Sequence, residues 1–137
     1  MTYDEVKKLL EDIKDKKRLA LRIKQEINTL RENYDILLSP LGNVAVTHSI
    51  QSSSVERLVE RVEDKRDEFE TTLQEIYDLE DILAQAIKTL TPVQQNIITG
   101  YYMQDKTHDK LAEECNYCER SIKYIKRRAI EKLARKL

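Results

Sequence analysis

A regular spacing of apolar residues runs through residues 3–38 without a single glycine or proline. The spacing alternates between three and four residues, and Lys16 is the one polar residue at these positions. Such a seam, sustained over more than four heptads, is typical of a helix that pairs with another helix. At 1.5 Å per residue, the predicted helix is about 50 Å long. The seam consists of Val6, Leu9, Ile13, Lys16, Ala20, Ile23, Ile27, Leu30, Tyr34 and Leu37.

A second seam with the same spacing follows a polar segment. Residues 39–53 contain a proline, a glycine and four serines, a composition that indicates a loop. Ser53 and Glu56 have the spacing of a capping box at the start of a new helix. Because two helices of similar length are joined by one loop, we expect residues 1–90 to form an antiparallel coiled-coil hairpin. The second seam consists of Val55, Leu58, Val62, Lys65, Phe69, Thr72, Ile76, Leu79, Leu83, Ala86 and Leu90.

The composition excludes most other fold classes. Two glycines and two prolines are too few for an all-β chain, which needs a turn roughly every 8–12 residues. A hydrophobic fraction of 40 % supplies a core, although 36 % of the residues are charged. The first residues lack the apolar segment of a signal peptide, and no run approaches the ~18 apolar residues of a membrane span. We therefore expect an all-α protein of the cytoplasm that does not enter a membrane.

Apolar residues also lie beside the two seams. A two-helix hairpin buries a single stripe on each helix, so these residues stay available for a second copy of the chain. We expect a homodimer with a four-helix arrangement, while capture of a partner's helix is the alternative use of the hairpin. The residues in question are Leu10, Leu19, Leu21, Val59 and Ile82.

Residues 91–137 carry strong helix-capping signals. Thr91 and Gln94 form a capping box around a proline at the first helical position, where its missing N–H is not needed. Thr107 has the position of a second cap, and Asn116 tolerates the positive φ of a tight turn. We expect three helices, which begin at Pro92, His108 and Glu119 and end near residues 104, 114 and 136.

The last two of these helices have the pattern of a helix-turn-helix. Ala112 is a small residue where the second helix crosses the first, and Ile122 and Ile125 are apolar residues three apart. The opposite face of the second helix presents Glu119, Arg120, Ser121, Lys123, Tyr124 and Arg127. Its N-terminal half is expected to enter a major groove, and its basic C-terminal half to follow phosphates.

The charge distribution supports this hypothesis. Residues 1–90 carry 14 basic and 19 acidic residues, whereas residues 119–137 carry eight basic and two acidic ones. A basic end on an otherwise acidic body is expected when that end meets a polyanion. Phosphate contact or plain solvation is what we expect of Lys126, Arg128, Lys132, Arg135 and Lys136.

Residues 90–137 resemble the region-4 helix-turn-helix of sigma-70 factors. Most of the resemblance lies in Leu111-Ala112, in Arg120-Ser121-Ile122-Lys123 and in residues 128–133. With a helical hairpin in front, the chain is similar to phage regulators of the ArpU type, which activate late transcription. The resemblance implies sequence-specific binding of double-stranded DNA in a phage or prophage, with RNA polymerase as a further candidate partner. It assigns DNA contacts to Glu119, Arg120, Ser121, Lys123, Tyr124, Arg127 and Arg128.

The chain departs from the family pattern at three positions. Asp105 lies in a turn where the family often has glycine, and Lys110 replaces the usual acid of a capping box. Cys118 replaces the serine or threonine that normally caps the recognition helix, and a thiol is a poor cap. Nothing in the chain resembles a sigma region 2, so we do not expect it to melt a promoter unaided.

Other chemistry finds little support in the sequence. A structural zinc needs four ligands, and Cys115, Cys118 and His108 have no fourth ligand nearby, since His48 lies in the distant loop. A redox pair of cysteines belongs in a βαβ setting, which is not expected here. No phosphate-binding loop and no catalytic triad occurs, so we expect no enzyme and no cofactor. The alternative function is an interaction module, in which the hairpin binds a partner and the basic domain engages RNA polymerase without reading DNA.

Overall fold

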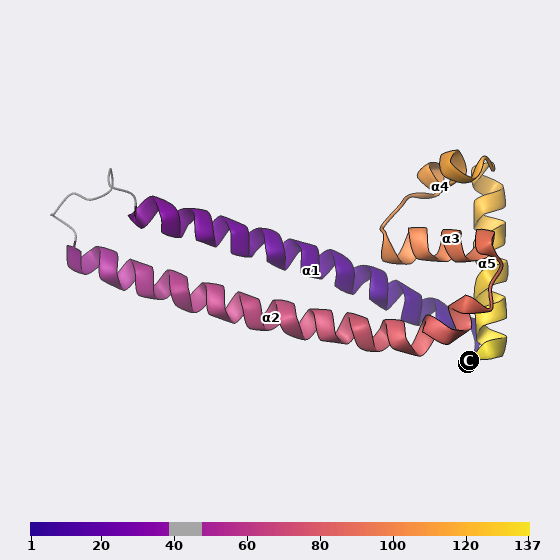
Figure 1. The fold of residues 1–137 in the computed structure, drawn as a ribbon, viewed down its shortest axis with the longest axis horizontal. Helices are drawn as coiled ribbons and strands as arrows, with labels where there is room; N and C mark the ends of the chain where they lie inside the picture. Colours follow the sequence, from indigo (N-terminus) through magenta and orange to yellow (C-terminus); the bar gives the residue numbers. More distant parts are fainter. Residues whose placement is uncertain (39–47) are drawn as a thin grey trace. The chain divides into compact units, whose positions relative to one another are not determined.

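The computed structural model describes residues 1–38 and 48–137, with side chains for residues 1–34 and 54–137. This part of the chain contains helices and no strands, which confirms the predicted all-α class (Figure 1). Within it, no helix has both the length and the apolar character needed to cross a membrane. The elements are α1 (Tyr3–Leu38), α2 (His48–Lys88), α3 (Pro92–Ile98), the π-helix η3 (Thr99–Met103), α4 (His108–Cys115) and α5 (Glu119–Lys136).

Helix α1 has the bounds that the first seam predicts, whereas α2 begins earlier than expected. Residues 48–53 are helical, so the predicted loop over 39–53 is wrong for this part. The segment contains no glycine or proline, and serine is only moderately unfavourable in a helix, so the helix extends through it although the apolar seam does not. The capping box at Ser53 therefore does not start the helix. Residues 39–47 lie outside the described residues.

The chain divides into two compact units, one formed by residues 1–17 with 75–137, the other by residues 18–74. In the second unit the two long helices lie side by side and antiparallel (Figure 1). Lys65, a polar member of the seam, lies 2.7 Å from a carboxylate oxygen of Glu26 and 3.4 Å from one of Glu68. Its hydrogen bond with Glu26 raises the pKa of Lys65 and lowers that of Glu26. The buried residues of this unit are Ala20, Ile23, Ile27 and Thr72.

The larger core of the first unit joins the base of the hairpin to the C-terminal helices. Val6, Leu10 and Ile13 of α1 lie in this core with residues of α2, η3 and α5. Leu10 is 0 % exposed, so the prediction that it stays available for a second copy is wrong. Because α1 packs here against more than one neighbour, it buries a wider stripe than a two-helix seam does. The other members are Leu83, Ala86, Leu90, Ile98, Tyr102, Ala129, Ile130 and Leu133.

Helix α3 begins as the sequence predicts. Thr91 accepts a hydrogen bond from the Gln94 N–H, and the Gln94 side chain accepts one from the Thr91 N–H, which completes the capping box. The helix then continues as the π-helix η3, within which Gly100 lies against α4. A Cβ at Gly100 would lie 2.7 Å from Leu111 Cδ2, so the glycine permits this close approach.

Candidate nucleic-acid interface

Helices α4 and α5 form a helix-turn-helix with the predicted turn. The Lys110 N–H donates to Thr107 Oγ1 over 3.2 Å, so Thr107 caps α4 as predicted. Asn116 follows α4 with a φ of 58° and donates its N–H to the Ala112 carbonyl. This left-handed residue satisfies an end carbonyl of α4 and turns the chain toward α5. The packing between the helices forms a second core of Ile97, Leu111 and Ile122, against which Val93, Tyr101, Ala112, Cys115 and Ile125 pack.

The positive φ of Asn116 makes this position sensitive to substitution. We expect Asn116→Val to lower the free energy of unfolding by roughly 1–2 kcal/mol, because a branched side chain is strained in the left-handed region. Asn116→Gly relieves that strain and should leave the stability unchanged or slightly higher. Urea unfolding followed by circular dichroism measures both variants. Equal stability of the two would contradict the left-handed turn.

Helix α5 has one buried face and one exposed basic face. Ile122, Ala129, Ile130 and Leu133 are buried in the two cores. With 3.6 residues per turn, Arg120, Tyr124 and Arg127 point away from these residues, and Lys123 lies at the flank. These residues are all exposed, and Tyr124 retains 58 % of its accessible surface. The basic residues of this face therefore stand in solvent.

Several of the predicted contact residues have partners on α5 itself. Arg128 Nε donates to the Tyr124 hydroxyl over 3.0 Å, and its guanidinium lies 5.4 Å from the centre of that ring. Lys123 Nζ lies 3.3 Å from Glu119. Arg127 and Arg128 lie 3.5 and 3.8 Å from the carboxylate of Glu131. Exposed pairs of this kind contribute little stability, so a nucleic acid can replace them at small cost.

The carboxylate of Glu119, at the start of α5, lies beside a carboxylate of α4. A hydrogen bond between Asp109 of α4 and Glu119 raises the pKa of Asp109 and lowers that of Glu119. Glu119 is also drawn toward Lys123, whose ammonium lowers its pKa further. When both carboxylates are ionised they repel each other, so this contact is not a stabilising link between α4 and α5.

Cys118 precedes α5 and forms no side-chain cap, in line with the expectation that a thiol caps poorly. Its sulfur lies 3.2 Å from Ser121 Oγ, and hydrogen bonding with Ser121 lowers the pKa of the thiol. The Ser121 side chain is half-buried in this contact, so it is the least accessible of the predicted contact residues. Cys115 is half-buried against the second core, and both cysteines are free. Among the described residues, no group of three or more His, Cys, Asp or Glu side chains could hold a metal ion.

The sequence predicts plain solvation or phosphate contact for Lys126, but its side chain is half-buried and does not lie on the solvated face. Its ammonium lies 2.9 Å from His108 Nε2 and 3.9 Å from the centre of the Tyr101 ring. Burial, together with the charges of Lys14 and Lys7, lowers the pKa of Lys126 to about 8. With 3.6 residues per turn, position 126 lies on the same side of α5 as the buried Ile122 and Leu133, so the helical period itself places Lys126 away from the solvated face. Its aromatic partner on η3 is a long-range contact that the spacing does not reveal. The residues that sequence reasoning missed here are Lys14, Tyr101 and His108.

Comparison with known proteins bears on the C-terminal part of the chain. Residues 86–135 match the family model of sigma-70, region 4. The match begins within α2 and covers α3, η3, α4 and nearly all of α5. Sigma-70 region 4 is a DNA-binding helix-turn-helix rather than an enzyme family. Neither the curated proteins nor the solved structures contain a match to the chain. Residues 86–135 are therefore a helix-turn-helix segment that is similar to sigma-70 region 4.

Proposed function

We propose that this protein is a sequence-specific DNA-binding regulator of transcription, and that it binds DNA without catalysing a reaction. The observation that carries the proposal is the exposed basic face of α5, which lies within the segment matching sigma-70 region 4. In a helix-turn-helix the second helix enters the major groove, and this helix presents Arg120 and Tyr124 on its outer side. Such a role belongs to the cytoplasm of a bacterial cell.

The proposed contacts divide into two kinds along α5. Arg120 and Lys123 lie near the start of the helix, where they would read base edges, and arginine suits the two acceptors of guanine. Tyr124 adds an apolar ring edge beside them, while Glu119 and Ser121 complete the N-terminal set. Arg127 and Arg128 lie further along and would contact phosphates, which fix the register without reading the sequence.

The test is selection of bound duplexes from a random library with the purified protein. Enrichment of a motif supports sequence-specific recognition. Binding without enrichment favours the alternative, in which the basic segment engages RNA polymerase and the hairpin binds another partner. A matched control uses Arg120→Ala, which should weaken or shift the enriched motif. Absence of binding to any duplex contradicts the proposed function.

A more specific role follows from the order of the parts. The arrangement of a long helical hairpin before a region-4-like segment is similar to that of ArpU-type phage regulators, so we propose a role in late transcription of a phage or prophage. The selected motif provides the test, because a late-gene regulator should find it upstream of a late operon. A reporter driven by that upstream region should respond to the wild-type protein and not to Arg120→Ala.

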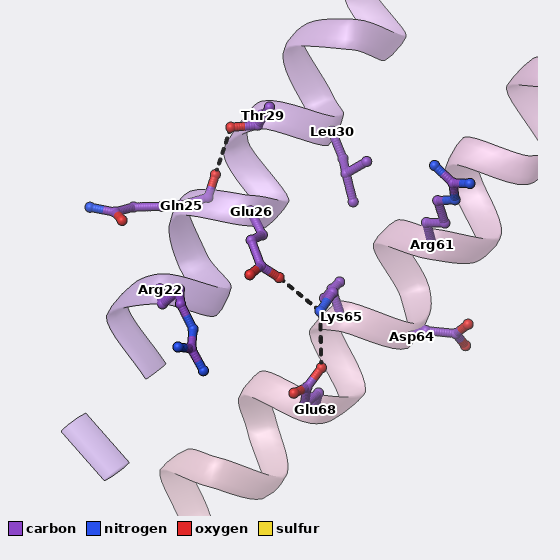
Figure 2. A pocket seen from close by; sticks show the side chains of 9 residues that line it. All are labelled: Arg22, Gln25, Glu26, Thr29, Leu30, Arg61, Asp64, Lys65 and Glu68. Atoms are coloured by element: carbon purple, nitrogen blue, oxygen red, sulfur yellow. Dashed lines mark hydrogen bonds and ion pairs between the residues drawn. The ribbon is translucent and has the colours of Figure 1, made fainter. Parts of the chain in front are cut away.

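We also propose that the hairpin makes the protein a homodimer. In the unit formed by residues 18–74, the described seam residues after Ile27 on α1 and before Thr72 on α2 are only half-buried. A groove of about 550 Å³ lies beside Lys65. Its lining residues include Leu30 and several charged side chains (Figure 2). A second groove, of about 250 Å³, has Tyr34, Leu58 and Val62 among its lining residues. A second copy of the chain would cover these half-buried residues in a four-helix arrangement.

Light scattering at micromolar concentration measures this state directly. We expect a particle of about twice the chain mass of 16.2 kDa. Val59→Lys should shift the population toward the monomer, because Val59 is an exposed member of the second groove. Arg57→Lys is the matched control on α2 and should leave the mass unchanged. A monomeric wild-type protein contradicts the homodimer.

A further inference from the structure

Four elements of the first unit meet at the ring of Tyr101. Lys14 Nζ of α1 lies 3.4 Å from the ring centre, and Lys126 Nζ of α5 lies 3.9 Å from it. His108, the first residue of α4, stacks on the same ring with 4.6 Å between centres and an interplanar angle of 26°. Tyr102 meets Tyr101 edge to face at 4.8 Å. Two ammonium groups thus share one aromatic ring, with an imidazole stacked on it.

The two lysines of this cluster differ in their anchors. Lys14 has a side chain that is only 12 % exposed and lies 3.8 Å from a carboxylate oxygen of Asp105. Lys126 instead makes its direct contacts with neutral groups, since its ammonium meets His108 Nε2 at 2.9 Å and the Tyr101 ring at 3.9 Å from the ring centre. Burial lowers the pKa of His108, and the charge of Lys126 lowers it further, so the imidazole is neutral and accepts the hydrogen bond. No carboxylate pairs with Lys126 among the described ion pairs.

We propose that Lys126 is a phosphate-binding residue that exchanges partners: in the free protein it packs on Tyr101 and His108, and in the DNA complex it contacts a backbone phosphate beside Lys123. The inference rests on the proposed DNA-binding function. Lys126 and Lys123 are three residues apart on α5 and therefore neighbours on its surface. The first helix of a helix-turn-helix crosses the DNA backbone, and His108 begins that helix here. A phosphate offers Lys126 a full negative charge, which a ring and a neutral imidazole do not.

The electrostatics of the cluster favour such an exchange. Burial lowers the pKa of Lys126 to about 8, and the nearby cations repel the same ammonium. A phosphate contact would raise this pKa, so the complex would hold a proton that the free protein has partly lost above pH 8. The sign follows from linkage, since the affinity falls with pH wherever the complex binds more protons than the free protein. The groups around Lys126 are Lys7, Glu11 and Lys14 of α1, Tyr101 and Tyr102 of η3, His108 of α4 and Lys123 of α5.

The experiment measures duplex affinity at several salt concentrations, at pH 7 and at pH 9. The thiol of Cys118 also has a lowered pKa and precedes α5, so all proteins carry Cys118→Ser. The reference protein carries Cys118→Ser and keeps Lys126. Its affinity for the duplex should fall about tenfold between pH 7 and pH 9, since one proton is linked to binding. Lys126→Met should remove this dependence and lower the magnitude of the salt slope by roughly 1, as loss of one phosphate contact does.

Two further variants separate the exchange from a structural role. Lys126→Arg keeps a charge that does not titrate, so it should keep the salt slope and lose the pH dependence. Lys88→Met removes an exposed charge at the end of α2 and should keep both properties. If Lys126→Met keeps the wild-type salt slope, or Lys126→Arg keeps the pH dependence, the proposed exchange is wrong. Failure of the reference protein to bind any duplex overturns the proposed function itself.

Discussion

Replacing Leu10 with alanine should lower the free energy of unfolding by about 2–5 kcal/mol, the range for a buried leucine that leaves a cavity. Leu10 is 0 % exposed and packs in the core shared by α1, α2, η3 and α5. Urea unfolding followed by circular dichroism measures the loss. Lys24→Ala is the matched control, because Lys24 is exposed on the same helix and lines neither of the two grooves proposed to meet a second copy. The control should change the stability by no more than about 0.5 kcal/mol.

The same substitution tests whether the helix-turn-helix depends on the hairpin. Ala129, Ile130 and Leu133 of α5 lie in one core with Leu10, so α5 should lose protection from hydrogen exchange together with α1. The sequence predicts a boundary at residue 90, which would make residues 91–137 a domain of their own. If Leu10→Ala leaves the exchange of α5 amides unchanged, the shared core does not support α5.

Replacing Arg120 with alanine should weaken binding to the preferred duplex by about 1–3 kcal/mol and relax the preference at one or two positions. Arg120 is exposed in the first turn of α5, opposite the buried Ile122, where an arginine can reach base edges. Binding to a scrambled duplex should change much less. Titration of both duplexes by fluorescence anisotropy gives the two affinities.

Lys136→Ala is the matched control for this prediction. Lys136 is exposed in the last turn of α5, so it can meet backbone phosphates and not the base edges read by the first turn. Its removal should weaken both duplexes alike and lower the magnitude of the salt slope by roughly 1. If Arg120→Ala also weakens both duplexes alike, Arg120 is not a base-reading residue.

Local sequence signals predict the helices of this protein well. The capping box at Thr91, the cap at Thr107 and the left-handed turn at Asn116 depend on neighbouring residues, and the structure confirms all three. The start of α2 is different, because the serines before Val55 neither break nor favour a helix strongly. Whether these serines are helical depends on the long helix that follows them, so their residue types alone do not predict where α2 begins.

Long-range packing is what the sequence could not predict. Leu10 and Leu21 are both leucines beside the α1 seam, yet one is buried and the other exposed. The difference arises because η3 and α5 pack on the first turns of α1, and heptad spacing carries no information about a third and fourth neighbour. Lys126 illustrates the same limit, since its partners Tyr101 and Lys14 lie on other elements.

The division of the chain into units also has a kinetic consequence. The unit that holds the helix-turn-helix combines residues 1–17 with residues 75–137. Its core therefore forms only when the intervening residues 18–74 make a loop that brings these two segments together. Contacts at such large sequence separation slow folding, because the closure entropy is lost before the core forms. Pairing of α1 with α2 within residues 18–74 shortens the effective separation before that step. We expect substitutions at buried Ile23 and Ile27 to slow the folding of the helix-turn-helix, although neither residue belongs to its core.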